Sequence, residues 1–188
     1  MRLKTIPLYA VLAFAACTSP NQSSNMTEDY TQYVNPFIGT DFTGNTYPGA
    51  QVPFGMVQLS PDNGLPGWDR ISGYFYPDST IAGFSHTHLS GTGAGDLYDV
   101  SFMPVTLPYK EAEAPLGIHS KFSHANESAY AGYYQVKLDD YNINVELTAT
   151  ERCGIQRYTF PKAEAAIFLN LSKAMNWDAT QDSHIEAV

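Results

Sequence analysis

Basic and charged side chains are scarce in this chain. Of its 188 residues, 10 are Lys or Arg and 19 are Asp or Glu, which gives a net charge of −9, and charged residues make up only 15% of the total. Proteins that bind nucleic acids neutralise phosphates with clusters of Lys and Arg. The sequence contains no such cluster, so we expect no nucleic-acid partner.

Cysteine is also nearly absent, since Cys17 and Cys153 are the only two. So small a number excludes the disulfide framework that holds many small secreted domains together. Cys153 lies in strand-like sequence, and we predict a buried, chemically inert thiol there rather than a nucleophile.

Long apolar runs are missing, apart from a short one near the N-terminus. Residues 6–16 are apolar and follow Arg2 and Lys4. This run is too short to span a bilayer, and it has the length of the apolar region of an export signal. We therefore interpret residues 1–17 as a signal peptide and expect the protein to be exported, to the periplasm or the cell surface.

The signal sequence ends at Phe14-Ala15-Ala16-Cys17. Small residues before a cysteine resemble the site at which bacterial lipoproteins are cleaved and lipidated. We predict that Cys17 carries lipid, that the lipid anchors the protein to a membrane, and that residues 18–32 form a polar tether. Phe14 stands where leucine is usual, and ordinary cleavage near Ala16 is the alternative.

Tyrosine, glycine and proline are plentiful, at 13, 14 and 12 residues. Short stretches of alternating apolar and polar residues recur at intervals of about ten residues, separated by turn residues and without an amphipathic helix. This pattern predicts an all-β protein, with an antiparallel β-sandwich over residues 33–188. Residues 182–188 look like the start of a further strand, so we expect the domain to be truncated at its C-terminal end. The predicted strands are 51–60, 81–88, 100–105, 132–138, 143–150, 154–160 and 166–171.

Two histidines stand two residues apart in GFSHTHLSGTGAGD, residues 83–96. On a strand, the imidazoles of His86 and His88 would share one face about 7 Å apart. That spacing permits a shared zinc with Asp96 or Asp99, but no third histidine is near, and we assign no metal to it. The alternatives are a pair of hydrogen-bonded strand histidines and a polar site that faces a cavity.

The glycines that follow these histidines superficially resemble a phosphate-binding loop. No Lys-Ser or Lys-Thr follows them, and no βαβ unit surrounds them, so we do not expect nucleotide binding. The glycines instead allow the backbone to turn tightly and to approach another group closely.

A tryptophan stands in a Pro/Gly loop at Pro66-Gly67-Trp68-Asp69-Arg70. Such a tryptophan either packs on the core or forms an exposed platform. Gly67 would let a ligand reach the backbone, and Asp69 offers a hydrogen-bonding carboxylate. Both interpretations of Trp68 stay open at this point.

A longer set of motifs resembles the N-terminal domain of glycoside hydrolase family 92, the exo-acting α-mannosidases of bacteria such as Bacteroidetes. The resemblance runs from about Tyr33 to the C-terminus. The motifs are VNPFIGT at 34–40, GNTYPGA at 44–50, VPFGMVQLSPD at 52–62, SGY at 72–74, GFSHTHLSGTG at 83–93 and AGYY at 131–134.

This resemblance implies a β-sandwich followed by an (α/α)₆ barrel, with the active site between the two domains. It implies calcium-dependent hydrolysis of terminal α-mannosides of glycans with inversion, in which one carboxyl acts as acid and another as base. The acid, the base and the main calcium ligands belong to the barrel, so no catalytic residue is assigned in this chain.

Residues on the sandwich side of the cleft can be carried over. Trp68 and Gly67 match the loop that lines the terminal mannose subsite, with Asp69 beside them. His86 and His88 are weaker candidates for shaping the same interface. The alternative function is a stand-alone carbohydrate-binding lipoprotein, which would keep Trp68 as a platform and need no barrel.

Overall fold

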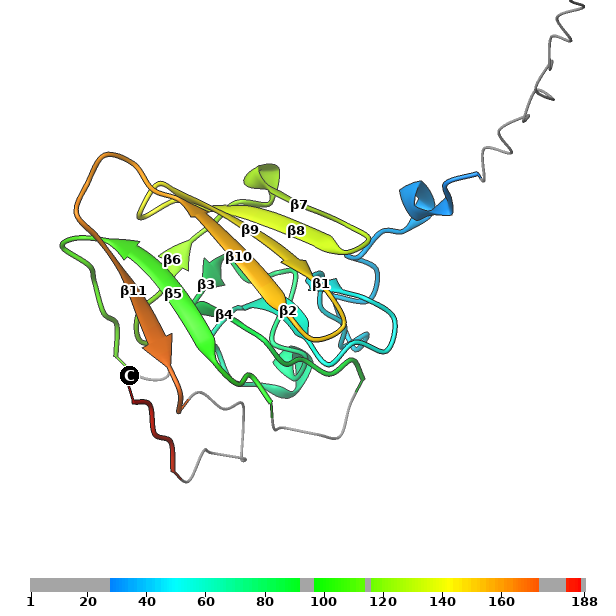
Figure 1. Cartoon of the computed structure of the whole chain (residues 1–188), viewed down its shortest axis with the longest axis horizontal. Helices are drawn as coiled ribbons and strands as arrows, with labels where there is room; N and C mark the ends of the chain where they lie inside the picture. Colours follow the sequence, from blue (N-terminus) through cyan, green and yellow to red (C-terminus); the bar gives the residue numbers. More distant parts are fainter. Residues whose placement is uncertain (1–27, 92–96, 114–115, 173–181, 187–188) are drawn as a thin grey trace, which may run out of the picture.

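The computed structural model describes residues 28–91, 97–113, 116–172 and 182–186. These residues form two antiparallel sheets that face each other, with a small two-stranded sheet and short 3-10 turns beside them (Figure 1). The predicted antiparallel β-sandwich is therefore confirmed. In the described ranges, no helix is long and apolar enough to cross a membrane.

The first sheet has five strands in the order β1-β2-β4-β5-β11. Its longest pairing joins β5 to β11, from Ser101 opposite Asn170 to Thr106 opposite Ala165. The strands are β1 (Ala50–Gln51), β2 (Gln58–Asp62), β4 (Gly83–Ser85), β5 (Ser101–Thr106) and β11 (Ala165–Asn170).

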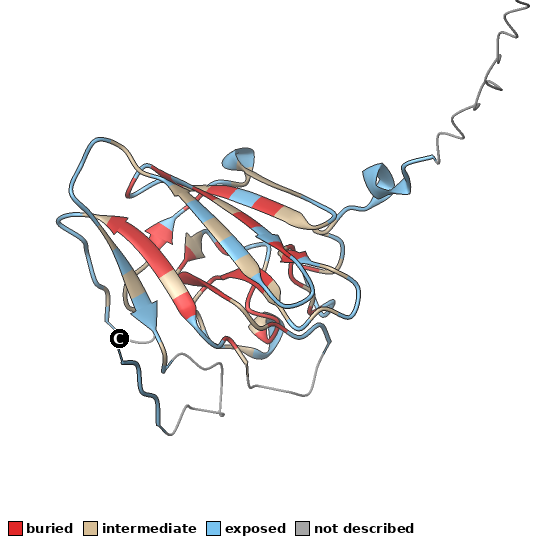
Figure 2. Cartoon of the chain, viewed as in Figure 1, coloured by how far each residue is buried: buried red, intermediate tan, exposed pale blue. Residues whose placement is uncertain are grey.

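The second sheet has four strands in the order β10-β9-β8-β7. Burial alternates residue by residue along β8 and β9, because successive side chains of a strand point to opposite faces (Figure 2). Asn142, in the turn between these two strands, has a φ of 51°, a conformation that asparagine tolerates well. The strands are β7 (Glu127–Tyr130), β8 (Tyr133–Leu138), β9 (Ile143–Ala149) and β10 (Gly154–Thr159).

The strand predicted over 81–88 is divided in the structure. β3 (Thr80–Ile81) pairs with β6 (Ser120–Lys121) in the small sheet, whereas β4 pairs with β2 in the first sheet. The chain changes sheets at Ala82 and at Gly83, whose φ is 154°. The strand ends at Ser85, so His86 and His88 lie beyond it and do not share a strand face.

Other details differ from the sequence predictions. Residues 182–186 have no regular secondary structure, so the strand expected to start there is not found in them. Tyr30–Tyr33 form a 3-10 turn, η1, where the end of the tether was predicted. Cys153 is exposed rather than buried, because it lies in the turn between β9 and β10. Cys17 lies outside the described residues.

The core lies between the two sheets. It is built from the inward side chains of both layers, and partly buried aromatics pack around it. Burying such side chains contributes about 1.5–3 kcal/mol each. Fully buried members include Leu59, Phe84 and Val105 from the first sheet and Tyr134, Leu138, Ile143, Val145 and Leu147 from the second.

One carboxylate gathers hydrogen bonds from several segments of the chain. Glu127 accepts from Tyr74 Oη at 3.0 Å, from Tyr134 Oη at 2.6 Å and from His124 Nδ1 at 2.6 Å, and its side chain is 1% exposed. His124 stacks on Tyr76 with ring centroids 4.0 Å apart. Burial, together with the charge of Glu127, raises the pKa of Tyr134 well above its ordinary value, so the phenol remains a donor.

We expect Glu127→Gln to lower the free energy of unfolding by about 2 kcal/mol or more. The two tyrosine hydroxyls donate to different oxygens of Glu127, so the amide keeps the shape of the carboxylate but turns its N–H₂ group towards one of these donors. At least one charge-assisted hydrogen bond is lost. Urea unfolding would measure the change. Glu164→Gln, at an exposed position, is the control. Equal stability of the two variants would contradict a structural role for the Glu127 carboxylate.

Candidate functional site

The candidate site centres on a turn that follows β2. Trp68–Arg70 form the 3-10 turn η2, and Trp68 is 52% exposed, so the interpretation as an exposed side chain holds over that of a core residue. Gly67, which precedes the turn, has a φ of 150°, a backbone conformation that favours glycine. Asp69 is exposed on the same turn. Three of the predicted site residues, Gly67, Trp68 and Asp69, therefore lie on one turn at the surface.

An ion pair between Arg70 and Asp78 holds the C-terminal end of the turn. The guanidinium of Arg70 donates two hydrogen bonds of 2.5 Å to the Asp78 carboxylate, and its Cζ lies 4.8 Å from the centre of the Phe75 ring. The Asp78 bonds are the main cause of a raised pKa for Arg70. A bidentate, partly buried ion pair restricts both side chains. The backbone that carries Trp68 is therefore fixed by folding rather than by a ligand.

The base of the loop is tied to the first sheet by Asn63, which is fully buried. The backbone N–H of Asn63 donates to Gly73 O at 2.8 Å, and its side-chain amide donates to Thr80 O at 2.8 Å. Asn63 Oδ1 accepts from the Phe75 backbone N–H. Asn63, at the start of the loop, is thereby hydrogen-bonded to Gly73 and Phe75 at its end.

His88 lies behind this loop and is buried. Its Nδ1 is 2.7 Å from Gln58 O, and its Nε2 is 2.8 Å from Asp62 Oδ1. The ring packs against Tyr47 and edge-on against Tyr98, with centroid distances of 5.1 and 5.3 Å. Of the alternatives for the histidine pair, His88 fits the one in which it is hydrogen-bonded to its neighbours.

The hydrogen bonds around His88 limit its chemistry. Gln58 O can only accept, so Nδ1 donates to it. Nε2 lies within hydrogen-bond distance of both Asp62 Oδ1 and Ser85 Oγ, at 2.8 and 3.2 Å. Ser85 Oγ donates to Asp62 Oδ1 at 3.0 Å, and Ser85 is fully buried. A serine that donates to the carboxylate and has no access to substrate is not a nucleophile. The group is a buried positioning network.

Tyr98 connects this network to the Trp68 turn. Its hydroxyl donates to the carbonyl of Ile71, the residue that follows η2. Gly73 makes the contact possible, because a Cβ at that position would lie 2.7 Å from Tyr98 Cε1 and 2.9 Å from His88 Cδ2. The loop, the tyrosine and the histidine therefore pack directly on one another.

His86 does not join them. Its Nδ1 bonds to Val100 O at 2.8 Å, and its ring meets Phe102 edge-on at 5.6 Å. A Cβ on Gly154 would come within 3.0 Å of the His86 ring, which places the ring against the start of β10. His86 and His88 consequently do not converge on a common ligand.

A shared metal finds no support in the residues that the structure describes. They contain no group of three or more His, Cys, Asp or Glu that could hold a metal ion. Asp99, a possible third ligand from the sequence, accepts from Thr87 Oγ1 at 2.9 Å. Asp96, the other possible ligand, lies outside the described residues.

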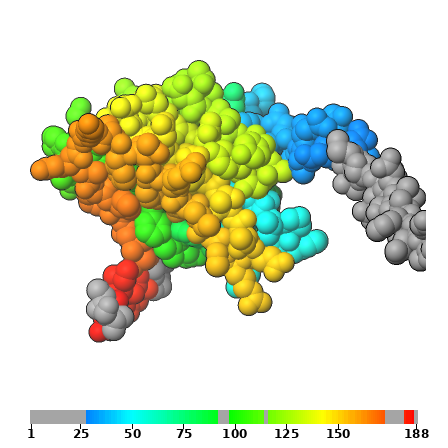
Figure 3. Space-filling model, turned by 45° about the horizontal axis from the view of Figure 1, so that its top comes forward, coloured from blue at the N-terminus to red at the C-terminus, as the bar shows by residue number. Residues whose placement is uncertain are grey.

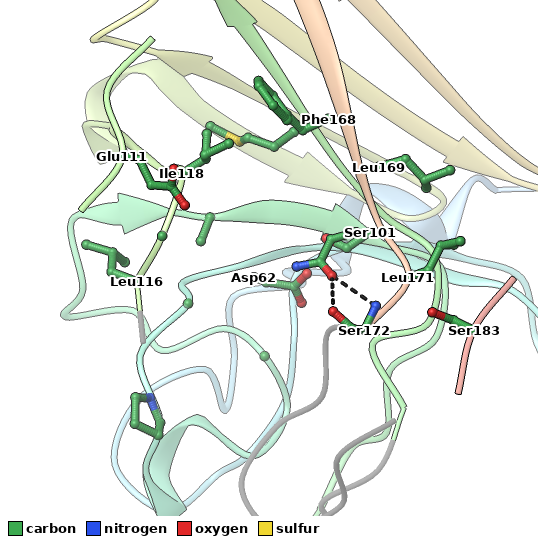
Figure 4. Close-up of a pocket in the computed structure, with 17 residues that line it drawn as sticks. Asp62, Ser101, Glu111, Leu116, Ile118, Phe168, Leu169, Leu171, Ser172 and Ser183 are labelled. Carbon is green, nitrogen blue, oxygen red and sulfur yellow. Dashed lines mark hydrogen bonds between the residues drawn. The ribbon is translucent and has the colours of Figure 1, made fainter. Parts of the chain in front are cut away.

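A cavity of about 610 Å³ opens beside the base of the Trp68 loop. Figure 4 shows Asp62 and Ser101 pointing into it, with Leu116, Phe168 and Leu171 among its apolar walls. Asp62 thus contacts both this cavity and His88. Nothing in the local sequence reveals that the partner of Asp62 is a histidine 26 positions away.

Comparisons with known proteins agree with one another. The N-terminal domain of glycosyl hydrolase family 92 matches residues 33–188. A family GH92 α-mannosidase from Bacteroides thetaiotaomicron, solved with mannoimidazole, is 44% identical, with a TM-score of 0.72 over 77% of this chain and 20% of its own. A family GH92 inverting mannosidase from the same species is 31% identical, with a TM-score of 0.62 over 78% of this chain and 20% of its own.

A fungal relative gives the same picture at the level of sequence. An uncharacterized secreted glycosidase from Arthroderma benhamiae is 31% identical over 143 residues, which are 73% of this chain and 18% of that protein. The chain therefore spans about a fifth of the length of the relatives it matches. The family resemblance seen in the sequence is confirmed.

We expect Gly73→Ala to destabilise the protein by more than about 2 kcal/mol, because the methyl group overpacks Tyr98 and His88 and the backbone φ is +91°. Gly132→Ala is the matched control, since Gly132 also has a positive φ but a Cβ there meets nothing within 4 Å. That variant should lose only about 1 kcal/mol. Thermal unfolding compares them, and similar losses would show that packing behind the Trp68 loop is not tight.

Proposed function

The chain belongs to glycosyl hydrolase family 92, whose N-terminal domain it matches, and on that premise we propose that its sandwich forms one wall of the substrate cleft of an exo-α-mannosidase. The observation that carries this proposal is the Trp68 turn. It presents an indole that is 52% exposed on a loop fixed by Asp78, Asn63 and Tyr98.

Each residue of the turn has a distinct part in the proposal. The face of the Trp68 indole packs against the terminal mannose ring, because the electron-rich face of an aromatic ring attracts the C–H groups of a sugar. Gly67 lets the sugar reach the backbone, and the Asp69 carboxylate accepts a hydrogen bond from a sugar hydroxyl. His88 positions the loop from behind, and His86 shapes the more distant interface.

The proposed reaction of the whole protein is inverting hydrolysis of a terminal α-mannoside. One carboxyl protonates the leaving oxygen, and a second activates the water on the opposite face of the sugar. Both are proposed to lie in a second, catalytic domain, since this chain covers about a fifth of the mannosidases it resembles. The contribution of this chain is to bind and orient the sugar and to exclude water from one side.

Calcium belongs to this proposal for the whole protein. The described residues of this chain do not fit a calcium site, because no three of their acidic or histidine side chains come together. We propose that the main calcium ligands lie in the catalytic domain.

The proposed location is outside the cytoplasm. The secreted glycosidase among the relatives supports export, and the sequence of residues 1–17 supports a signal peptide. We further propose a lipid anchor on Cys17, followed by the polar tether. Mass spectrometry of the N-terminal peptide would detect the acylated cysteine.

We expect Trp68→Ala to weaken mannose binding by the purified chain by about fivefold or more, because the stacking surface is lost. Titration followed by NMR reports this directly, since the chain has only two indole N–H signals, from Trp68 and Trp177. Trp68→Phe assigns the signal and should retain part of the affinity.

Tyr33→Ala removes an aromatic side chain that is 70% exposed on η1 and serves as the control. Unchanged affinity in Trp68→Ala would contradict the role of the turn. Release of mannose from α-mannobiose by this chain alone would contradict the assignment of the acid and base to another domain.

We expect calcium to leave the unfolding midpoint of this chain unchanged, because a ligand raises stability only when the folded state binds it. Differential scanning calorimetry with calcium, with a chelator and with magnesium at equal ionic strength would measure this. A rise specific to calcium and reversed by the chelator would place a calcium site within the chain.

A further inference from the structure

A second candidate binding surface lies on the outward face of the sheet β10-β9-β8-β7. Tyr134 and Val136 of β8 point into the core, so their neighbours Tyr133 and Gln135 point outward. The strand pairings place these outward side chains in cross-strand rows. Figure 3 shows this face, from the yellow-green of β7 to the orange that follows β10.

The first row carries an aromatic platform. Tyr130 of β7 pairs with Tyr133 of β8, and their rings stack with centroids 4.6 Å apart and planes 15° apart. Tyr130 is 56% exposed although it is a large side chain. Each ring packs against the other and limits its rotation. The pair is therefore a rigid aromatic surface, which loses little conformational entropy when a ligand binds.

The second row is an ordered polar lane. Gln135, Glu146 and Arg157 lie side by side on β8, β9 and β10. Tyr133 Oη donates to Glu146 Oε1 at 2.6 Å and approaches Gln135 Oε1 at 3.1 Å, which joins this lane to the platform. Arg157 donates to both oxygens of Glu146, from Nε at 2.6 Å and from Nη2.

The Glu146 carboxylate in this row is charged, and the Arg157 guanidinium balances its charge. The Arg157 bonds, followed by that from Tyr133, lower the pKa of Glu146, so the carboxylate is ionised. Three of its roughly four lone-pair positions are occupied by these bonds. The remaining position can accept a hydroxyl, while the charges of Glu146 and Arg157 cancel.

The face is hollowed beside this lane. A depression of about 300 Å³ has the backbone of Val136 and Val145 in its floor and Gln135, Asn144 and Thr159 at its rim. This volume lies at the lower end of the range for ligand sites, about 300–1,000 Å³. Gln135 lies one row of side chains from the platform, whereas Asn144 and Thr159 lie two rows away, or about 14 Å along the strands. A ligand that reaches from the platform to Asn144 is therefore longer than one sugar ring.

We propose that this outer face binds a neutral oligosaccharide, with one sugar ring on Tyr130 and the hydroxyls of neighbouring sugars bonded by Gln135, Glu146 and Asn144. Amides and a paired carboxylate provide both donors and acceptors, which suits hydroxyl groups that need both. Lys137, opposite Asn144, and Arg157 are the two cations in the outward rows of these strands, and Arg157 is already bound by Glu146. An acidic ligand is disfavoured, because the chain as a whole has a net charge of −9. A protein partner is disfavoured, because the centre of the face is polar.

This surface is separate from the Trp68 turn. The turn follows β2, a strand of the other layer, and in Figure 1 it lies on the opposite side of the molecule from β7–β10. A glycan bound at the outer face would therefore hold the protein on a branched or repeating substrate while the Trp68 turn engages a terminal sugar. This second contact does not depend on the proposed role of Trp68.

The test is native gel electrophoresis of the purified chain through gels that contain yeast mannan, galactomannan or dextran. At least one glycan should retard the wild-type chain. Tyr130→Ala and, separately, Gln135→Ala combined with Asn144→Ala should raise the apparent dissociation constant by about fivefold or more. Tyr130→Trp should keep the retardation, because it preserves the platform.

Controls separate the two surfaces and exclude unfolding. Tyr33→Ala removes an exposed aromatic elsewhere and should be retarded like the wild type, and each variant is first shown to keep the wild-type unfolding midpoint. Trp68→Ala should still be retarded. The proposal is overturned if no glycan retards the wild-type chain, if the outer-face variants are retarded as strongly as the wild type, or if only Trp68→Ala loses the effect, which would leave the Trp68 site alone.

Discussion

The buried contact between His88 and Asp62 is the interaction on which the candidate site depends. It joins the end of β2 to the loop after β4, and it forms the surface on which Tyr98 and Gly73 pack. Tyr98 in turn donates a hydrogen bond to the carbonyl of Ile71, the residue that follows the Trp68 turn. A buried histidine–carboxylate contact adds little net stability, but it allows few alternative arrangements of the groups around it. These contacts hold the loop against the first sheet.

Long alternating strands could be predicted from the sequence, because their period of two is a local property. β8, β9 and β10 were predicted to within about a residue or two at each end. The two-residue strands β1 and β6 could not be predicted, since they exist only through their partners β2 and β3. The division at Ala82 and Gly83 was also missed, because the choice between two sheets is made by distant strands.

Those parts of the site that depend on a local motif could also be predicted from the sequence, whereas those that depend on distant residues could not. The Pro66–Arg70 motif identified Trp68 as either a core residue or a platform. The contacts of Asp78, Asn63 and Tyr98, which hold the loop that carries Trp68, come from outside this motif. The spacing of His86 and His88 suggested a shared face, yet the strand ends before both. Cys153 seemed buried because its neighbours resemble strand residues, whereas the turn between β9 and β10 places it in solvent.

The hub at Glu127 has a consequence for how sequences of this domain can vary. Its donors come from a loop after β2, from a turn before β7 and from β8, so residues of three separate segments meet at a single buried carboxylate. Changing one member leaves the others without partners, whereas changing several together can restore satisfaction. Such positions are expected to evolve as a linked set, and a homologue that lacks the glutamate should also have replaced its tyrosines. We therefore expect Tyr74, Glu127 and Tyr134 to covary among the sequences of homologous domains.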